Sequence, residues 1–221
     1  MSSEVTNRGR LYILSAPSGT GKTTVAERLA GRLPRVRLST SYTSRQARAG
    51  ERDGEHYHFV TRERFEAMVA GDQFLEWADV FGNYYGTALL DTERALADGD
   101  DLVLVIDVQG ARKVRRRGVP VVSVFLLPPS APVLESRLRG RNLDTDDVIR
   151  HRLDVARAEV PAFREYDYVV VNDDVDACVE HLACIVTSER LRLERMRGAA
   201  ERIAAGFGAV APPGEGEVPW P

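Results

Sequence analysis

The sequence predicts an α/β fold in which helices cover both faces of a parallel sheet. Four short apolar runs alternate with segments of helical periodicity along the chain. A continuous apolar run predicts a strand buried on both faces, and such strands belong to parallel sheets whose crossovers are helices. The length of 221 residues suits one domain with room for insertions.

The core elements are predicted from these apolar runs and from the residues that end them. Gly31 and Pro34 end the first helix, and Gly99 and Gly118 end two later ones, because glycine and proline interrupt helical periodicity. A long charged helix is expected after the last strand. The expected strands are 11–15, 101–106, 119–127 and 168–171, and the expected helices are 23–33, 89–97, 111–117, 131–139 and 175–205.

Two stretches interrupt this alternation. Residues 39–87 combine small polar, aromatic and charged residues around a helix at 62–70, which predicts a small mixed α+β insertion. Residues 137–155 hold five arginines and few apolar anchors, so we expect a weakly packed segment that moves as a helical lid. The expected divisions are core 1–38, insertion 39–90, core 91–136, lid 137–155, core and C-terminal helix 156–205, and a Pro/Gly-rich disordered tail 206–221.

The composition excludes several classes of protein. Lys and Arg number 30 against 33 Asp and Glu, a formal net charge of −3, so no nucleic-acid partner is expected. Cys178 and Cys184 are six apart in an expected helix and therefore on different faces, which predicts no disulfide and a reduced, cytoplasmic setting. The first ten residues lack the apolar segment of a signal peptide, and the run Val119–Leu127 is too short to cross a membrane.

A phosphate-binding loop lies between the first strand and the first helix. It reads Ser15-Ala-Pro-Ser-Gly-Thr-Gly-Lys-Thr-Thr24 and matches the P-loop except that Ala16 replaces the first glycine, so the core is of the P-loop NTPase type. Gly19 and Gly21 permit backbone conformations that aim N–H groups at phosphate oxygens. Lys22 is expected to reach the β- and γ-phosphates, and the Thr23 hydroxyl to bind Mg²⁺. The residues expected at ATP are Ala16, Pro17, Ser18, Gly19, Thr20, Gly21, Lys22, Thr23 and Thr24.

Four motifs follow the loop in a fixed order. They are Ser41-X-X-X-Arg45-X-X-Arg48, Gly54-Glu-His-Tyr57, Phe74-Leu-Glu76 and Gly82-Asn-Tyr-Tyr-Gly-Thr87. In this combination the chain resembles the guanylate kinase family, from Leu11 to about Arg192. The resemblance implies a GMP-binding domain at 39–90, a mobile arginine-bearing lid, and transfer of the γ-phosphoryl group of MgATP to GMP in purine nucleotide metabolism. We also expect dGMP as an acceptor, because no residue that we can name senses the 2′-hydroxyl.

The resemblance also implies a set of site residues. The GMP phosphate is expected between Arg45, Arg48, Tyr57 and Tyr85, and the guanine base is expected at Ser41, Glu76, Thr87 and Asp107. Arg137, Arg141 and Arg152 of the lid are implied to stabilise the transferring phosphoryl group together with Lys22 and Arg45, and Asn172 is implied to lie near the adenine of ATP.

The role of Glu76 can also be argued from the chemistry of the base. The N1–H and N2–H groups of guanine can both donate to one ionised carboxylate, whereas adenine presents an unprotonated N1 to the same position. A buried polar group without a partner costs about 1–3 kcal/mol, and sites that recognise a donor reject an analogue that lacks it. Glu76 is therefore the residue expected to select guanine.

Two other functions remain open at this stage. A related kinase of ribose 1,5-bisphosphate would share the core but would have no reason to present Glu76 to a base. A non-catalytic guanylate-kinase-like interaction module would have lost the phosphate cradle, which this chain retains. A homo-oligomer formed through the C-terminal helix also remains open.

One position departs from the family pattern. Val105 stands two residues before Asp107, where the family usually carries a second acid near the metal. Because a strand has a period of two, both side chains lie on the same side. We expect Asp107 or water to compensate, at some cost in Mg²⁺ affinity.

Overall fold

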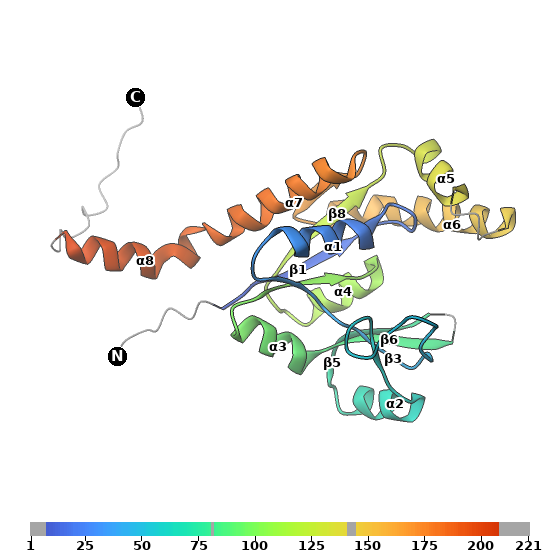
Figure 1. The fold of residues 1–221 in the computed structure, drawn as a ribbon, viewed down its shortest axis with the longest axis horizontal. Helices are drawn as coiled ribbons and strands as arrows, with labels where there is room; N and C mark the ends of the chain where they lie inside the picture. Colours follow the sequence, from blue (N-terminus) through green and yellow to red (C-terminus); the bar gives the residue numbers. More distant parts are fainter. Residues whose placement is uncertain (1–7, 81, 141–144, 208–221) are drawn as a thin grey trace. The chain divides into compact units, whose positions relative to one another are not determined.

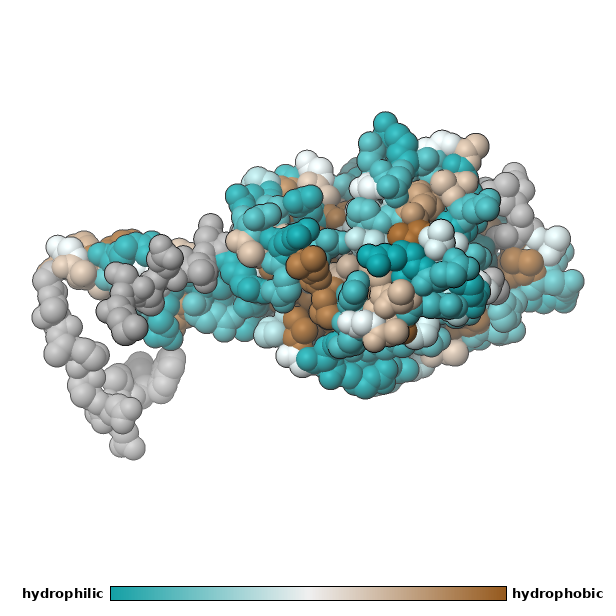
Figure 2. Space-filling model, turned by 90° about the horizontal axis from the view of Figure 1, so that it is seen from below, coloured by the Kyte–Doolittle hydropathy of each residue, from teal (hydrophilic) through white to brown (hydrophobic). Residues whose placement is uncertain are grey.

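The computed structural model describes residues 8–80, 82–140 and 145–207. Within these ranges the chain forms two compact units, which divide between residues 184 and 185. Figure 1 shows the succession of helices and strands along the chain. Hydrophilic side chains cover most of the face shown in Figure 2, with smaller apolar areas between them.

A five-stranded sheet forms the centre of the first unit (Figure 1). Its order is β2-β7-β1-β8-β9, and all four neighbouring pairs are parallel, which confirms the predicted α/β fold. The strands are β1 (Leu11–Ser15), β2 (Val36–Leu38), β7 (Asp101–Val105), β8 (Val121–Leu127) and β9 (Tyr168–Val171). Because β1 and β7 are parallel neighbours, their carboxyl ends meet at one edge, which is where open α/β sheets bind ligands.

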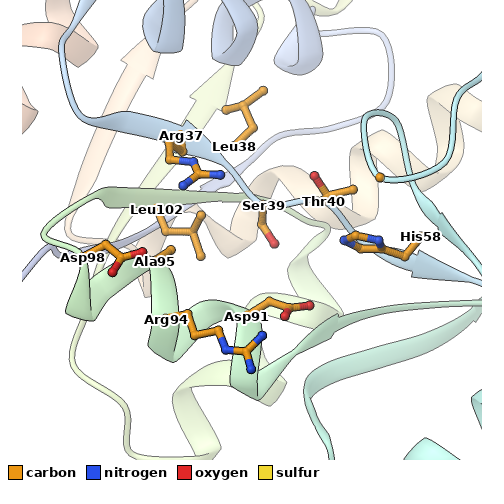
Figure 3. Close-up of a pocket in the computed structure, with 11 residues that line it drawn as sticks. Arg37, Leu38, Ser39, Thr40, His58, Asp91, Arg94, Ala95, Asp98 and Leu102 are labelled. Atoms are coloured by element: carbon orange, nitrogen blue, oxygen red, sulfur yellow. The ribbon is translucent and has the colours of Figure 1, made fainter.

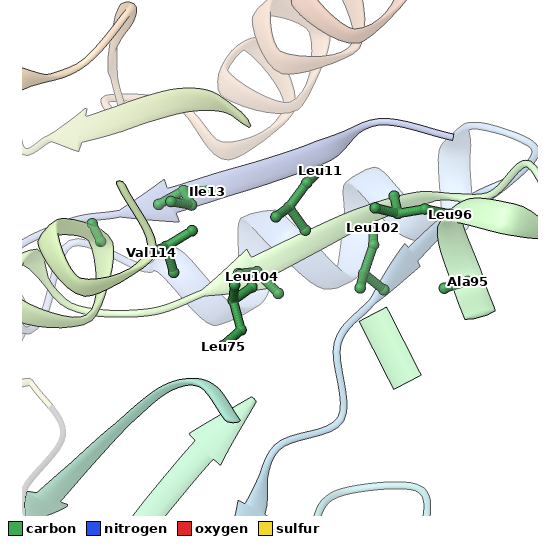
Figure 4. Close-up of a cluster of buried hydrophobic side chains, with 9 residues drawn as sticks. Leu11, Ile13, Leu75, Ala95, Leu96, Leu102, Leu104 and Val114 are labelled. Atoms are coloured by element: carbon green, nitrogen blue, oxygen red, sulfur yellow. The ribbon is translucent and has the colours of Figure 1, made fainter. Parts of the chain in front are cut away.

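Helices on both faces bury the apolar strands. On one face, Leu11 and Ile13 of β1 and Leu104 of β7 pack in a cluster with side chains of α3 (Leu89–Ala97) and α4 (Val108–Arg116) (Figure 4). On the other, α1 (Lys22–Arg32) contacts β1, β2 and β7 and buries Val25 and Leu29. Leu75 reaches the first cluster from the insertion, so the insertion is anchored in the core.

The insertion folds around a second, mixed sheet of order β4-β3-β6-β5, in which β3 and β4 are parallel and the other pairs antiparallel. The helix α2 (Arg62–Ala70) begins at Thr61, whose side chain accepts a hydrogen bond from the backbone N–H of Arg64. Phe65 stacks on Phe74 in its small core, with ring centroids 4.4 Å apart. The strands are β3 (Tyr42–Thr43), β4 (His58–Phe59), β5 (Phe74–Val80) and β6 (Asn83–Ala88). This confirms a small mixed α+β insertion, although its limits at 39 and 90 remain predictions.

The segment predicted as a lid contains the end of α5 (Ala131–Arg139) and most of α6 (Asp146–Glu159), which leads into the short helix η1 (Val160–Glu165). The apolar anchors in 137–155 are few, as expected, but they are buried, and the movement of this segment as a lid stays a prediction. Leu138 and Ile149 are buried together with neighbours from the same two helices, because α5 and α6 turn their apolar residues toward each other. Arg141 lies outside the described residues.

The expected continuous helix 175–205 is wrong, because the structure contains two helices there. The helix α7 (Val175–Arg190) ends before Leu191, and α8 (Leu193–Gly206) begins after Arg192. Arg192 has φ −57° and ψ 142°, an extended conformation that interrupts the helical hydrogen bonds. No glycine or proline marks this break. The expected tail lies outside the described residues from position 208 onward.

Within α7, Cys178 is buried and Cys184 is exposed, and both are free thiols. The expectation that they lie on different faces is therefore confirmed. Among the residues that the structure describes, no helix is long and apolar enough to cross a membrane.

Candidate active site

The loop between β1 and α1 has the backbone of a phosphate cradle. Gly19 and Gly21 have φ values of 89° and 91°, which lie in the left-handed region that favours glycine. Space imposes the same requirement. A Cβ on Gly19 would lie 2.6 Å from the Leu138 side chain, and one on Gly21 would lie 2.9 Å from Asn172 Nδ2. Both glycines are therefore fixed by conformation and by packing.

Lys22 stands in the first turn of α1, beside the carboxyl end of β7. Its Nζ donates a hydrogen bond to the backbone oxygen of Ile106 at 3.1 Å. Burial lowers the pKa of Lys22, and the carboxylates of Asp107 and Glu159 oppose that shift. The first turn of α1, all of whose residues are described, carries no acidic side chain. The positive end of the helix dipole is therefore available to an anion, with Thr23 and Thr24 exposed beside it.

Glu76 and Asp107 bring two carboxylates together at the same edge of the sheet. Glu76, on β5, is 7% exposed, and the Thr87 hydroxyl donates to its Oε1 at 2.8 Å. Asp107 begins α4, and its Oδ1 accepts from the backbone N–H of Gly110 at 2.7 Å. A Cβ on Gly110 would lie 3.2 Å from Glu76 Oε2 and 3.3 Å from Asp107 Oδ1, so the two carboxylates flank this glycine. Burial is the main cause that raises the pKa of Glu76, and the charge of Asp107 adds to it.

A cluster built around Arg45 forms the other part of the insertion site. Its Nη1 and Nη2 each donate to one oxygen of Glu51 at 2.9 Å, and its Nε donates to the Tyr85 hydroxyl at 3.2 Å. The guanidinium carbon lies 5.4 Å from the centroid of the Tyr57 ring. The structure thus unites Arg45, Tyr57 and Tyr85, as predicted from the sequence motifs. Arg48 is exposed beside them, and its backbone N–H donates to Glu51 at 2.7 Å.

Two acids of this site were not predicted. Glu51 accepts two hydrogen bonds from the guanidinium of Arg45. These bonds, with the one from the Arg48 backbone, lower the pKa of Glu51 to about 2. Glu159 is half-buried at the end of α6. Burial raises its pKa, and the charge of Lys22 partly opposes that shift. Acidic residues in charged stretches usually lie on a solvated surface, so the sequence carries no signal for either role. Their partners are brought close only by the fold.

The remaining predicted residues lie around this centre. Arg137 on α5 donates through Nη1 to the backbone oxygen of Asn172 at 2.7 Å and through Nη2 to that of Asp173 at 3.0 Å. Asn172 is buried, and its side chain donates to the backbone of Thr20. Ser41 is half-buried just before β3, Arg152 is half-buried on α6, and Val105 is the partly buried last residue of β7.

A cavity of about 280 Å³ opens where the insertion leaves the core (Figure 3). Its walls include Arg37 of the edge strand β2, His58 of the insertion, and Asp91 and Arg94 of α3. None of the residues predicted for ATP or GMP lines it. This cavity is therefore separate from the site around Lys22 and Glu76.

The donor set fits a magnesium ion that arrives with phosphates. Among the described residues, no group of three or more His, Cys, Asp or Glu side chains could hold a metal ion. The oxygen donors near the loop include the Thr23 hydroxyl and the Asp107 carboxylate, and oxygen ligands are those that Mg²⁺ prefers. Mg²⁺ usually keeps several waters and is bound through substrate phosphates and one or two protein ligands, which this arrangement allows.

The comparisons with known proteins agree with the sequence motifs. The sequence model of the guanylate kinase family matches residues 8–189. The guanylate kinase of Carboxydothermus hydrogenoformans is 44% identical over 190 residues, covering 86% of this chain and 93% of that protein. The guanylate kinase of Aromatoleum aromaticum is 49% identical over 184 residues, covering 83% and 90%. A crystal structure of guanylate kinase from Anaplasma phagocytophilum is similar with a TM-score of 0.72 and 34% identity, covering 92% and 98%.

Proposed function

Because the chain belongs to the guanylate kinase family of nucleoside monophosphate kinases, we propose that it phosphorylates GMP with MgATP. The bond between the γ-phosphorus and its bridging oxygen to ADP breaks, and a bond forms between that phosphorus and an oxygen of the GMP phosphate. The products are ADP and GDP. The observation that carries this proposal is the pairing of the buried Glu76 with the half-buried Asp107 at the sheet edge that also holds Lys22.

Guanine recognition follows from the hydrogen bonds of Glu76. The Thr87 hydroxyl donates to Oε1 of Glu76, while Oε2 points toward Gly110 and Asp107. A guanine base placed here offers N1–H and N2–H to the carboxylate, and each new donor favours its ionised form over the protonated form that burial favours. Adenine cannot offer N1–H, so its binding leaves the second oxygen of this buried carboxylate, Oε2, without that donor. This site therefore supports GMP over AMP.

The GMP phosphate is proposed to bind at Arg45 and Arg48. Four of the five N–H groups of Arg45 donate to Glu51, Tyr85 and the backbone oxygen of Gln46. Its guanidinium is therefore held in one orientation before substrate binds. The exposed Arg48 and the Tyr57 and Tyr85 hydroxyls supply further donors, and charged forks suit a dianionic phosphate.

Transfer of the phosphoryl group requires positioning and fixed positive charge rather than a covalent protein intermediate. Lys22, the loop N–H groups and the N-terminus of α1 place positive charge where the β- and γ-phosphates bind. Magnesium held through Thr23, water and the phosphates would neutralise further charge on the triphosphate. The lid arginines Arg137, Arg141 and Arg152 are proposed to approach the transferring group.

We further propose that dGMP is a second acceptor and that the enzyme recycles GMP in the purine nucleotide metabolism of the cytoplasm. Among the described site residues, none has been assigned to the 2′-hydroxyl of the sugar. The proposed function is tested by measuring ADP formation from MgATP in a coupled assay. GMP, dGMP, AMP and ribose 1,5-bisphosphate are compared as acceptors.

Turnover with GMP and dGMP, and little with AMP, is the expected result. Turnover with ribose 1,5-bisphosphate alone would replace the proposal with the related sugar kinase. Absence of GMP binding and of any turnover would favour the non-catalytic interaction module. A Lys22→Met variant, assayed in parallel, controls for contaminating kinases. Its GMP site should still bind GMP, which shows that the variant is folded.

A further inference from the structure

Asn172 is far from the phosphate-binding loop in the sequence but contacts it in the structure. It follows β9 directly, is 1% exposed, and its Nδ2 donates to the backbone oxygen of Thr20 at 2.6 Å. A carbonyl oxygen can only accept, so the amide nitrogen of Asn172 must face it. The backbone N–H of Asn172 in turn donates to the oxygen of Leu127 at 2.8 Å, which ties this residue to β8.

The bond to Thr20 determines where the next N–H group points. The described residues contain no cis peptide bond, and in a planar trans peptide the C=O and N–H of one unit point in opposite directions. With the Thr20 oxygen turned toward Asn172, the N–H of Gly21 is turned away from it. Among the described residues, the Gly21 N–H has no hydrogen-bond acceptor. This donor is therefore available to a ligand.

We propose that Asn172 is a positioning residue that fixes the Thr20–Gly21 peptide so that the Gly21 N–H donates to a phosphate of the bound nucleotide. The proposal rests on the proposed function for the identity of that nucleotide. It assigns to Asn172 a role in the triphosphate cradle rather than at the adenine base.

The surroundings of Asn172 support this assignment. Its Oδ1 is buried and has no donor among the described residues, so in this structure it is shielded from a base. A Cβ on Gly21 would lie 2.9 Å from Asn172 Nδ2, which shows how closely the amide packs on the loop. Arg137 donates to the same backbone through the oxygens of Asn172 and Asp173. The amide is therefore fixed both at its own backbone and against the loop.

The test compares a ligand that has a base with one that has only phosphates. Isothermal titration calorimetry would measure the affinities of ATP, inorganic tripolyphosphate and GMP for the wild-type chain and for Asn172→Leu and Asn172→Asp. Leucine removes the donor without adding charge, and aspartate keeps the shape but cannot donate. The exposed Gln73, in the loop between α2 and β5, provides a matched control as Gln73→Glu.

A positioning role predicts that both Asn172 variants weaken ATP and tripolyphosphate by the same factor, about tenfold, as expected for the loss of one hydrogen bond. GMP affinity should be unchanged, since its site is separate, and the control should match the wild type. Loss of ATP affinity alone would overturn the proposal in favour of a base contact. Unchanged affinity for both phosphate ligands, or an equal loss of GMP affinity, would also overturn it.

A second measurement needs no variant. In the wild-type chain labelled with ¹⁵N, tripolyphosphate should move the amide proton resonance of Gly21 downfield, because a charged acceptor forms a strong hydrogen bond. An unshifted Gly21 resonance at saturation would overturn the proposal. The outcome is independent of the kinase assay: a chain that fails to phosphorylate GMP yet shows these phosphate effects would contradict the proposed function alone.

Discussion

The two halves of the candidate site are built in different ways. The triphosphate side is a stretch of backbone, in which Gly19 and Gly21 shape a loop that a single side chain, Asn172, holds in place. The monophosphate side is made of side chains from separate strands and loops, joined in pairs such as Arg45 with Glu51 and Glu76 with Thr87.

This difference decides how each half tolerates change. A backbone cradle presents N–H groups that no side-chain substitution removes, so it depends on conformation and on one charged residue, Lys22. A side-chain site depends on each partner separately, and a change in one partner alters its neighbour's orientation. We therefore expect graded losses on the monophosphate side and a single large loss at Lys22.

The largest effect is expected for Lys22→Met. Methionine keeps most of the side-chain volume and removes the charge that faces the β- and γ-phosphates. The expected result is a fall in kcat of about 10³-fold, similar to the loss of a fixed group that stabilises a transition state. Steady-state assay of ADP formation measures this. GMP affinity should not change, and a matching loss of GMP binding would show that the two halves are not separable.

Glu76→Gln is expected to have the next largest effect. Glutamine can still accept from Thr87 but brings an NH₂ group toward the N–H donors of guanine. The value of kcat/KM for GMP should fall about 100-fold, while KM for ATP stays unchanged. Glu63→Gln, an exposed acid on α2, serves as the control. Unchanged selectivity between GMP and AMP would remove Glu76 from guanine recognition.

Glu51→Gln distinguishes preorganisation from competition. If Glu51 orients Arg45 for the GMP phosphate, losing the charged fork should raise KM for GMP about tenfold with a smaller change in kcat. If Glu51 instead competes with the phosphate for Arg45, KM should fall. Initial-rate kinetics at saturating MgATP decide between the two, with the exposed Glu55→Gln of the same loop as the control.

The smallest effect concerns pH. Burial raises the pKa of Glu76, and GMP requires its ionised form, so GMP affinity should fall as pH drops through that raised pKa. The same shift means that the folded chain holds this proton more tightly than the unfolded chain. The contribution of Glu76 to the free energy of unfolding therefore decreases as the pH rises from its pKa in the unfolded chain to its pKa in the folded chain.

Calorimetric titration of GMP at several pH values tests this prediction, with Glu76→Gln as the reference. The variant should lose the acidic decrease in affinity. A decrease of the same size in both proteins would assign the pH dependence to another group, such as the GMP phosphate itself.

Much of the fold was predictable because its signals are local. The apolar runs at 11–15 and 168–171 coincide with β1 and β9, and the helices at 62–70, 89–97 and 131–139 coincide with α2, α3 and α5. The strands β2 and β3 were not predicted, because three and two residues are too few to show a period. The break at Arg192 was missed because it is a matter of one backbone torsion angle, without glycine or proline.

The sequence by itself determined the phosphate cradle, the motif residues of the GMP side and the family to which they point. All of these depend on residue types at short, fixed spacings, and backbone conformation responds directly to such local patterns. Only the tertiary structure decided which partners these residues have. Asn172 reaches Thr20 across 152 positions, and Glu159 approaches Lys22 from the end of another helix. Hydrogen bonds and burial between distant segments depend on how the elements pack, and no spacing in the chain encodes that.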